Sequence, residues 1–140
     1  MVMLQRAKAI AAAAHAGQVD KANQPYFGHL MRVMEAAPEG DAKVVAILHD
    51  LIEDCPDWDL DRLGQEGFEP QVIEAIDAMT KKPGQDYGGY LAGVKANDLA
   101  RVVKLADLAD NMRLDRIPNP GPKDFQRLAK YKAAREFLEN

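Results

Sequence analysis

The chain has 140 residues, of which 47% are hydrophobic and 29% charged, a balance typical of one folded domain spanning residues 1–140. No apolar run approaches the roughly 20 residues needed to cross a bilayer, so we expect no membrane anchor. The formal net charge of −4 argues against broad binding to nucleic acid, which requires many lysines and arginines. Cys55 is the single cysteine, and the first residues do not resemble a secretion signal, so we expect a cytoplasmic protein.

Helical periodicity dominates the chain, and no segment shows the alternation of a sustained β-strand, so the predicted fold is all-α. An alanine-rich first helix should cover Leu4 to Ala16, with Gly17 as its stop. The loop Gln18 to Pro25 leads to the second helix. The remaining helices are expected over Tyr26 to Ala37, Ala42 to Asp54, Leu60 to Glu66, Pro70 to Met79, Tyr87 to Ala96, Asp98 to Leu114 and Lys123 to Leu138.

The third of these helices is the most apolar and should occupy the centre of the fold. Asp41 is its expected N-cap, and Pro56 should stop it. Its C-terminal end carries the run His49-Asp50-Leu51-Ile52-Glu53-Asp54. Positions three and four apart share a helix face, so an imidazole and three carboxylates should form one patch. Crowded carboxylates repel one another, and a divalent metal is the simplest compensation.

A metal bound by this patch would need ligands from elsewhere in the chain. His29 in the second helix and Asp107 in a later one each interrupt an apolar helical face. We therefore expect them to join His49 and Asp50 as ligands. Imidazole and carboxylate together suit Mn²⁺, Fe²⁺ or Zn²⁺ better than Ca²⁺, and the lack of a cysteine cluster disfavours a structural zinc site.

These motifs, in this order and spacing, resemble the HD superfamily of phosphohydrolases, and more narrowly the hydrolase domain of RelA/SpoT proteins and the small alarmone hydrolases. The resemblance covers most of the chain. It rests on His15-Ala16-Gly17-Gln18, Lys21, Pro25-Tyr26, His29, His49 to Asp54, Met79-Thr80-Lys81-Lys82, Lys104 to Asp107 and Asn111-Met112. It implies a single HD-type helical bundle that binds Mn²⁺ through four ligands: His29, His49, Asp50 and Asp107.

The same resemblance implies catalytic residues and a substrate. Glu53 and Asp54 match the acidic pair that handles the attacking water. Three residues match the nucleotide pocket of such enzymes: Lys21, Lys104 and Asn111. The implied substrate is guanosine tetraphosphate or pentaphosphate, which loses its 3′-pyrophosphate. The alternatives are an HD hydrolase of another nucleotide or phosphomonoester, and a sensor that binds a nucleotide without turnover.

The chain departs from the family pattern around the expected nucleotide pocket. Asp20 stands where arginine is common, Asn23 where glycine is common, and Leu108 to Asp110 where Arg-Leu-His is common. Asp20 is therefore expected to repel a polyphosphate. Asp110 is expected on a solvated helix face, and the Lys81-Lys82 pair is expected to be exposed loop charge rather than a phosphate ligand.

Overall fold

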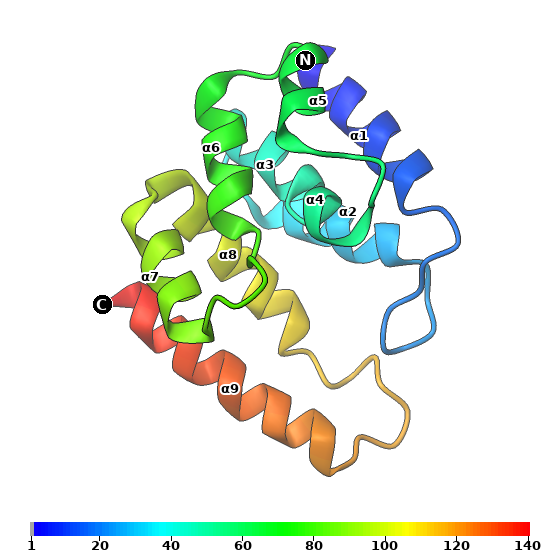
Figure 1. Cartoon of the computed structure of the whole chain (residues 1–140). Helices are drawn as coiled ribbons and strands as arrows, with labels where there is room; N and C mark the ends of the chain where they lie inside the picture. Colours follow the sequence, from blue (N-terminus) through cyan, green and yellow to red (C-terminus); the bar gives the residue numbers. More distant parts are fainter. Residues whose placement is uncertain (1) are drawn as a thin grey trace.

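The computed structural model describes residues 2–140, and nine helices account for most of this range (Figure 1). They are α1 (Val2–Ala14), α2 (Tyr26–Ala36), α3 (Asp41–Leu48), α4 (Leu51–Asp54), α5 (Leu60–Gln65), α6 (Pro70–Met79), α7 (Tyr87–Ala96), α8 (Asp98–Asn111) and α9 (Pro122–Glu139). Between residues 2 and 140 the β-type pairing is limited to one antiparallel bridge, between Val19 and Pro25. The predicted all-α fold is confirmed. No helix in this range is long and apolar enough to cross a bilayer.

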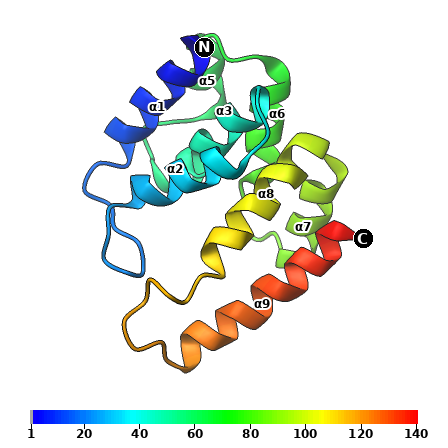
Figure 2. The same ribbon diagram turned by 180° about the vertical axis from the view of Figure 1, so that it is seen from behind.

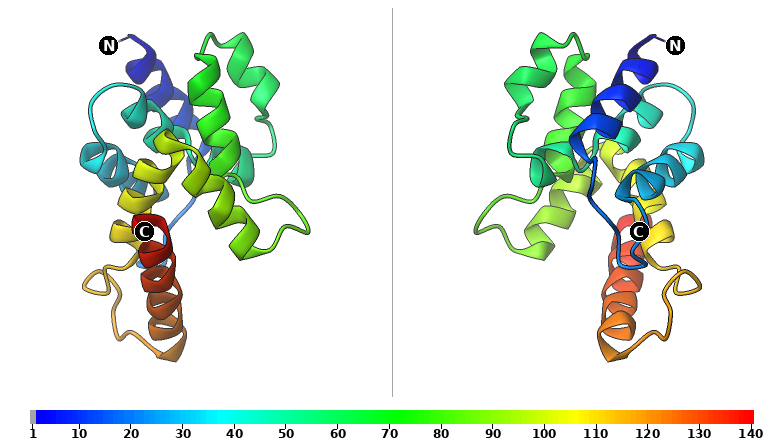
Figure 3. Two further views of the ribbon diagram at one scale, coloured as in Figure 1. Left: turned by 90° about the vertical axis from the view of Figure 1, so that its left-hand side faces the viewer. Right: turned by 90° about the vertical axis from the view of Figure 1, so that its right-hand side faces the viewer.

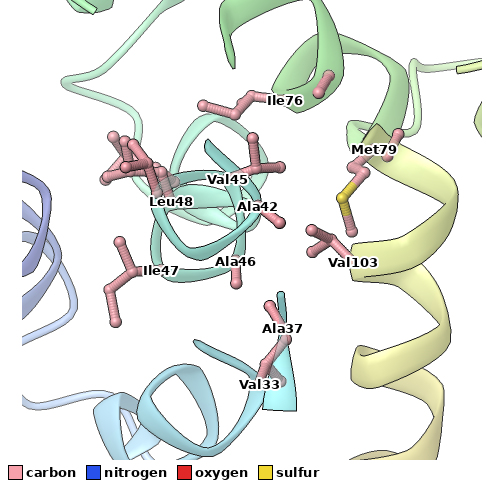
Figure 4. Packing of buried hydrophobic residues seen from close by; sticks show 14 of the residues in the cluster. Val33, Ala37, Ala42, Val45, Ala46, Ile47, Leu48, Ile76, Met79 and Val103 are labelled. Carbon is pink, nitrogen blue, oxygen red and sulfur yellow. The ribbon is translucent and has the colours of Figure 1, made fainter. Parts of the chain in front are cut away.

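Helix α3 lies at the centre of the bundle, as its apolar sequence predicts. Helices α1, α2, α6 and α8 surround it, and Figure 4 shows its side chains reaching toward these neighbours. Val45 points toward Ile76 of α6, and Ala46 points toward Val33 of α2. Every residue from Val44 to Leu48 is buried, so a helix of eight residues fills the middle of the core.

The C-terminal helix α9 packs against α7 and α8 at the outer side of the bundle (Figure 2). In the side views of Figure 3, its first turns project beyond the other helices. Two irregular segments, residues 15–25 and residues 112–121, lie on the same side of the molecule in Figures 1 and 2. An ion pair between Asp20 and Arg116 joins them across 96 positions of sequence. The packing of the helices therefore brings these two distant segments together.

The predicted helix over residues 42–54 is wrong in one respect, because it is not continuous. Helix α3 ends at Leu48, and the short α4 begins at Leu51. Asp50 lies between them with φ −101° and ψ 0°, a bridge conformation outside the helical region. The break turns the carboxylate of Asp50 toward Tyr26 and His49. The polar residues of this segment therefore lie beyond the end of the buried helix.

Capping residues explain several other helix ends. Helix α1 ends at Ala14, two residues before the predicted Ala16, and Gly17, with φ +85°, lies in the turn that follows it. Gly40 is the N-cap of α3, so the expected cap Asp41 is instead its first residue. Asn97 caps α8, because its side chain accepts a hydrogen bond from the backbone N–H of Ala100 in the first turn. Helix α8 stops before the predicted Leu114.

The packing of α3 predicts a clear difference between two Val→Ala changes. Val45 is fully buried, whereas Val2 at the start of α1 is 75% exposed. Val45→Ala removes two buried methyl groups and leaves a cavity, so it should lower the free energy of unfolding by about 2 kcal/mol. Val2→Ala should change it by less than about 0.5 kcal/mol. Urea denaturation measures both values, and equal midpoints would contradict this account of the core.

Candidate metal centre

Four polar side chains from distant parts of the chain meet where α2, α3 and α8 pack together. They are His29 of α2, His49 and Asp50 after α3, and Asp107 of α8. Ligand atoms of His29, His49 and Asp50 lie within 4.8 Å of one another. The Oδ1 atom of Asp107 lies 2.9 Å from Nε2 of His29 and 3.2 Å from Nε2 of His49. The structure thus brings together the four residues that the sequence predicts as metal ligands.

Both histidines turn the same ring nitrogen, Nε2, toward this meeting point, because the other nitrogen is already bonded. Nδ1 of His49 lies 2.6 Å from the backbone oxygen of Ala46, one turn earlier in α3. Nδ1 of His29 lies 2.6 Å from Oδ2 of Asp110. A proton on Nδ1 in each hydrogen bond selects the tautomer whose Nε2 lone pair can bind a metal.

The hydroxyl group of Tyr26 holds the carboxylate of Asp50. Tyr26 donates a hydrogen bond to Oδ2 of Asp50. The ring centroid of Tyr26 lies 5.5 Å from that of His15 and 5.3 Å from that of His29. Burial and the charge of Asp50 raise the pKa of Tyr26 far above its ordinary value, so the hydroxyl remains a donor. Tyr26 thus has a positioning role that its sequence motif does not indicate.

The cluster combines buried charges of both signs, and the pKa values shift accordingly. Burial alone would lower the pKa of His49, but the carboxylates of Asp50 and Asp107 raise it well above its usual value. Burial would raise the pKa of Asp107, yet Lys104 and the two histidines hold it well below its usual value. Burial likewise would raise the pKa of Asp50, but His49 lowers it. Both carboxylates therefore stay ionised and need positive charge beside them.

The donor set fits a divalent transition metal. Two imidazole nitrogens and two carboxylates suit Mn²⁺, Fe²⁺ or Zn²⁺, whereas Ca²⁺ prefers oxygen ligands alone. His29, His49 and Asp107 are buried, and Asp50 is partly exposed. One side of the group therefore remains open to solvent, as a site that acts on an external ligand requires.

Two of the three predicted nucleotide contacts, Lys104 and Asn111, bond to Asp107. Nζ of Lys104 lies 3.0 Å from Oδ2, and Nδ2 of Asn111 lies 3.2 Å from Oδ1. Lys21 lies farther out, where its Nζ is 5.7 Å from the ring centroid of Tyr131. All three line cavities that adjoin the cluster. Lys104 and Asn111 therefore link those cavities to the metal-ligand candidates.

Two cavities adjoin the cluster, and Asn111 and Tyr131 line both of them. The His29 cavity, of about 410 Å³, has His29 and three cationic side chains in its wall: Lys21, Arg113 and Arg116. The lysine cavity, of about 510 Å³, has Glu53 and four lysines in its wall: Lys81, Lys82, Lys104 and Lys130. Cationic side chains thus outnumber acidic ones in both walls, which favours an anionic ligand.

The predicted catalytic pair, Glu53 and Asp54, lies on α4 directly after the break at Asp50. Oε1 of Glu53 accepts a 2.7 Å hydrogen bond from the backbone N–H of Lys81, which fixes this carboxylate at the wall of the lysine cavity. Partial burial and the carboxylates of Asp50 and Glu53 raise the pKa of Asp54 to about 6. A carboxylate with such a pKa is a competent proton acceptor near neutral pH.

Two expectations about acidic residues are corrected by the structure. Asp110 is 7% exposed and therefore does not lie on a solvated face, because it bonds to His29, Arg32 and Arg116. Asp20 does line the His29 cavity, but its charge is compensated. Its Oδ1 accepts two backbone N–H groups of its own loop, and Nη1 of Arg116 lies 2.9 Å from its Oδ2. The expected repulsion of a polyphosphate is therefore offset.

The chain is similar to a curated protein in sequence and to a solved structure in fold. No protein-family model matches the chain. The "Probable GTP pyrophosphokinase" of Mycobacterium leprae (strain TN) is 28% identical over 131 residues, which cover 84% of this chain. The chain spans 16% of the length of that relative. A solved structure, described as a metazoan ortholog of SpoT that hydrolyzes ppGpp and plays a role in starvation responses, matches with a TM-score of 0.80 and 18% identity, over 99% of this chain and 85% of the other.

This chain has the fold of that SpoT ortholog. The match confirms the HD-type helical architecture that the motifs predict, and both comparisons agree with the resemblance to RelA/SpoT proteins. The agreement in fold extends over 99% of the chain, which includes the segments that carry the four converging side chains.

Tyr26 and Tyr87 form a matched pair for testing how Asp50 is held. Tyr26→Phe removes a hydrogen bond to a charged group, which should lower the free energy of unfolding of the metal-free protein by about 1.5–3 kcal/mol. The hydroxyl of Tyr87 is buried without a hydrogen-bond partner among residues 2–140, so Tyr87→Phe should be neutral or stabilising. Urea denaturation compares the two variants. Equal losses would contradict the assigned role of Tyr26.

Proposed function

We propose that this protein is a metal-dependent phosphohydrolase that removes the 3′-pyrophosphate from guanosine tetraphosphate or pentaphosphate. The observation that carries this proposal is the convergence of two histidines and two aspartates beside an acidic pair. The shared fold supports it, since the protein with that fold is described as hydrolysing ppGpp. Metal, acidic pair and cationic cavities are the three parts that such a reaction needs.

We assign the four converging side chains to one divalent ion, with Mn²⁺ as the expected metal. An ion bound there would supply Lewis acidity, lowering the pKa of a water molecule and polarising a phosphoryl oxygen. The protein contributes a rigid set of donors, because each ligand is held by a further bond. Asp110 bonds to His29, the backbone oxygen of Ala46 bonds to His49, and Tyr26 bonds to Asp50. Lys104 and Asn111 both bond to Asp107.

Glu53 and Asp54 would handle the attacking water. One oxygen of Glu53 is fixed by the backbone of Lys81, which leaves the other oxygen to orient a water molecule. Asp54, with a pKa of about 6, would accept the proton that this water loses. The attack would form a bond from the water oxygen to phosphorus while the bond from phosphorus to the 3′-oxygen breaks. The proton held by Asp54 would then pass to the 3′-oxygen, so that a 3′-hydroxyl group and free pyrophosphate leave.

The two cavities support a substrate with phosphate groups in two places. The His29 cavity offers Lys21, Arg113 and Arg116. In the lysine cavity, Lys81 and Lys82 are exposed, as expected, and also line the wall. A nucleotide with diphosphates on both its 3′ and 5′ oxygens would place one anionic group toward each cavity. A nucleotide with a single phosphate chain would leave one cationic wall unpaired.

A nucleotide panel with Mn²⁺ and a Glu53→Ala variant tests the function. The unchanged protein should release pyrophosphate from guanosine tetraphosphate, and Glu53→Ala should slow this release roughly 10²-fold or more. The matched control Glu139→Ala, on the exposed end of α9, should leave the rate unchanged. Equal rates for Glu53→Ala and the unchanged protein would exclude the catalytic role. Faster turnover of another phosphate ester would favour a different HD hydrolase, and tight binding without turnover would favour a sensor.

The pKa of Asp54 predicts how the rate depends on pH. Its carboxylate form is the proton acceptor, so turnover should fall with pH on the acid side of about 6 and level off above it. A bound cation stabilises the carboxylate, which moves this acid limb to lower pH. Rate measurements across pH on the unchanged protein and on Asp54→Asn check the assignment. An identical acid limb in the residual activity of Asp54→Asn would assign it to another group.

A further inference from the structure

A network of two acids and two arginines adjoins His29. Its members are Asp20, Arg32, Asp110 and Arg116. Asp110 is central: Nε of Arg32 lies 2.7 Å from its Oδ1, and Nη2 of Arg32 lies 3.1 Å from its Oδ2. The same Oδ2 lies 2.6 Å from Nδ1 of His29 and 3.4 Å from Nη2 of Arg116. Both oxygens of Asp110 are therefore bonded, and its orientation has little freedom.

Arg116 connects this network to the wall of the His29 cavity. It lies in the segment before α9, where it faces Asp110 of α8 and Asp20 of the loop before α2. The side chain of Arg116 is 23% exposed, whereas those of Asp20 and Asp110 are 11% and 7% exposed. The guanidinium group thus bridges two largely buried carboxylates from different parts of the chain. Asp20 and Asp110, two positions at which the chain departs from the family pattern, are thus joined by the guanidinium group of Arg116.

Such a network has two possible roles, which differ in what they affect. A purely structural network would contribute only to stability, and buried ion pairs often contribute little net stability because desolvation offsets their attraction. A positioning network acts on the ring that it contacts. Here the bond from Asp110 occupies Nδ1 of His29, and the opposite nitrogen Nε2 lies 2.9 Å from Asp107 within the proposed metal centre. A carboxylate bonded to the outer nitrogen of a histidine ligand fixes the ring and strengthens its donor atom.

We infer that Asp110 is a positioning residue for His29, and that Arg116 holds Asp110 in place while attaching it to the His29 cavity. The inference rests on the proposed metal centre, but it concerns metal binding and not turnover. Asp110 is not one of the four proposed ligands and lines neither cavity, so its effect passes through the imidazole. Arg116 and His29, which both line the His29 cavity, are therefore joined through Asp110 into a single bonded unit.

Titration calorimetry of the full chain with Mn²⁺ tests the inference. Asp110→Ala should weaken Mn²⁺ binding by roughly 10- to 100-fold, the usual effect of removing such a partner. Arg116→Met should weaken it by a smaller factor, because Arg32 still holds Asp110. The matched control is Asp115→Ala, an exposed aspartate of the same segment that pairs with Arg113 and not with His29. Its Mn²⁺ affinity should equal that of the unchanged protein.

A second variant and a second measurement guard against a folding defect. Asp110→Asn keeps an oxygen that can accept the Nδ1 proton, so it should fold and bind Mn²⁺ with an affinity between those of Asp110→Ala and the unchanged chain. Proton and nitrogen NMR of the Zn²⁺-loaded protein reads the Nδ1–H group of His29 directly. Its proton signal should lie downfield and exchange slowly with water in the unchanged chain, and in Asp110→Ala it should move upfield and exchange faster, because the hydrogen bond to the carboxylate is lost. Urea denaturation of the metal-free variants measures their stability separately.

The outcomes separate this inference from the proposed function. Equal Mn²⁺ affinity for Asp110→Ala, Asp110→Asn and the unchanged protein would overturn the positioning role and leave the hydrolase proposal standing. Weaker binding by both variants, in a protein that hydrolyses no phosphate ester, would uphold the positioning role and overturn the hydrolase. An unchanged protein that takes up no Mn²⁺ would overturn both.

Discussion

The carboxylate of Asp107 lies in the interior of the bundle, where it is 4% exposed. An ionised group in such a position is stable only with charged or hydrogen-bonding partners around it. Its partners are His29 of α2, His49 at the end of α3, and Lys104 and Asn111 of α8. Lys104 and Asn111 belong to the same helix as Asp107, so the full set of partners is assembled only when α2 and α3 pack against α8. Fold and candidate site depend on the same contacts.

The short central helix explains how polar groups reach this point without disrupting the core. Helix α3 is buried on all sides through its apolar residues and stops at Leu48 (Figure 4). The bridge conformation of Asp50 then separates the ligand candidates from the acidic pair of α4. The backbone N–H of Asp54 still bonds to the oxygen of Asp50 at 3.0 Å, so the two functional groups stay adjacent. One break in a helix thus divides the proposed ligands from the proposed proton acceptor.

Local patterns were sufficient for much of this architecture. The period of 3.6 residues identified the helices and the central position of residues 44–48, because a buried helix is apolar on every face. His29 and Asp107 were recognisable as polar residues that interrupt apolar faces. Asp110 could have been recognised in the same way, since it lies three positions after Asp107 and so shares its face of α8. Arg116 gave no such signal, because it belongs to an irregular segment without a period.

The sequence by itself determined the helical elements, the apolar core and the chemical identity of the proposed ligands, because these depend on side-chain type and on spacing within a turn or two. Only the tertiary structure decided which ring nitrogen of each histidine faces the cluster, which carboxylates are compensated, and where the cationic cavities lie. Those features depend on bonds such as His29 to Asp107, 78 positions apart, and Asp20 to Arg116, 96 positions apart. Such pairs meet only through the packing of whole helices, and no local pattern encodes the relative placement of helices that are distant in sequence.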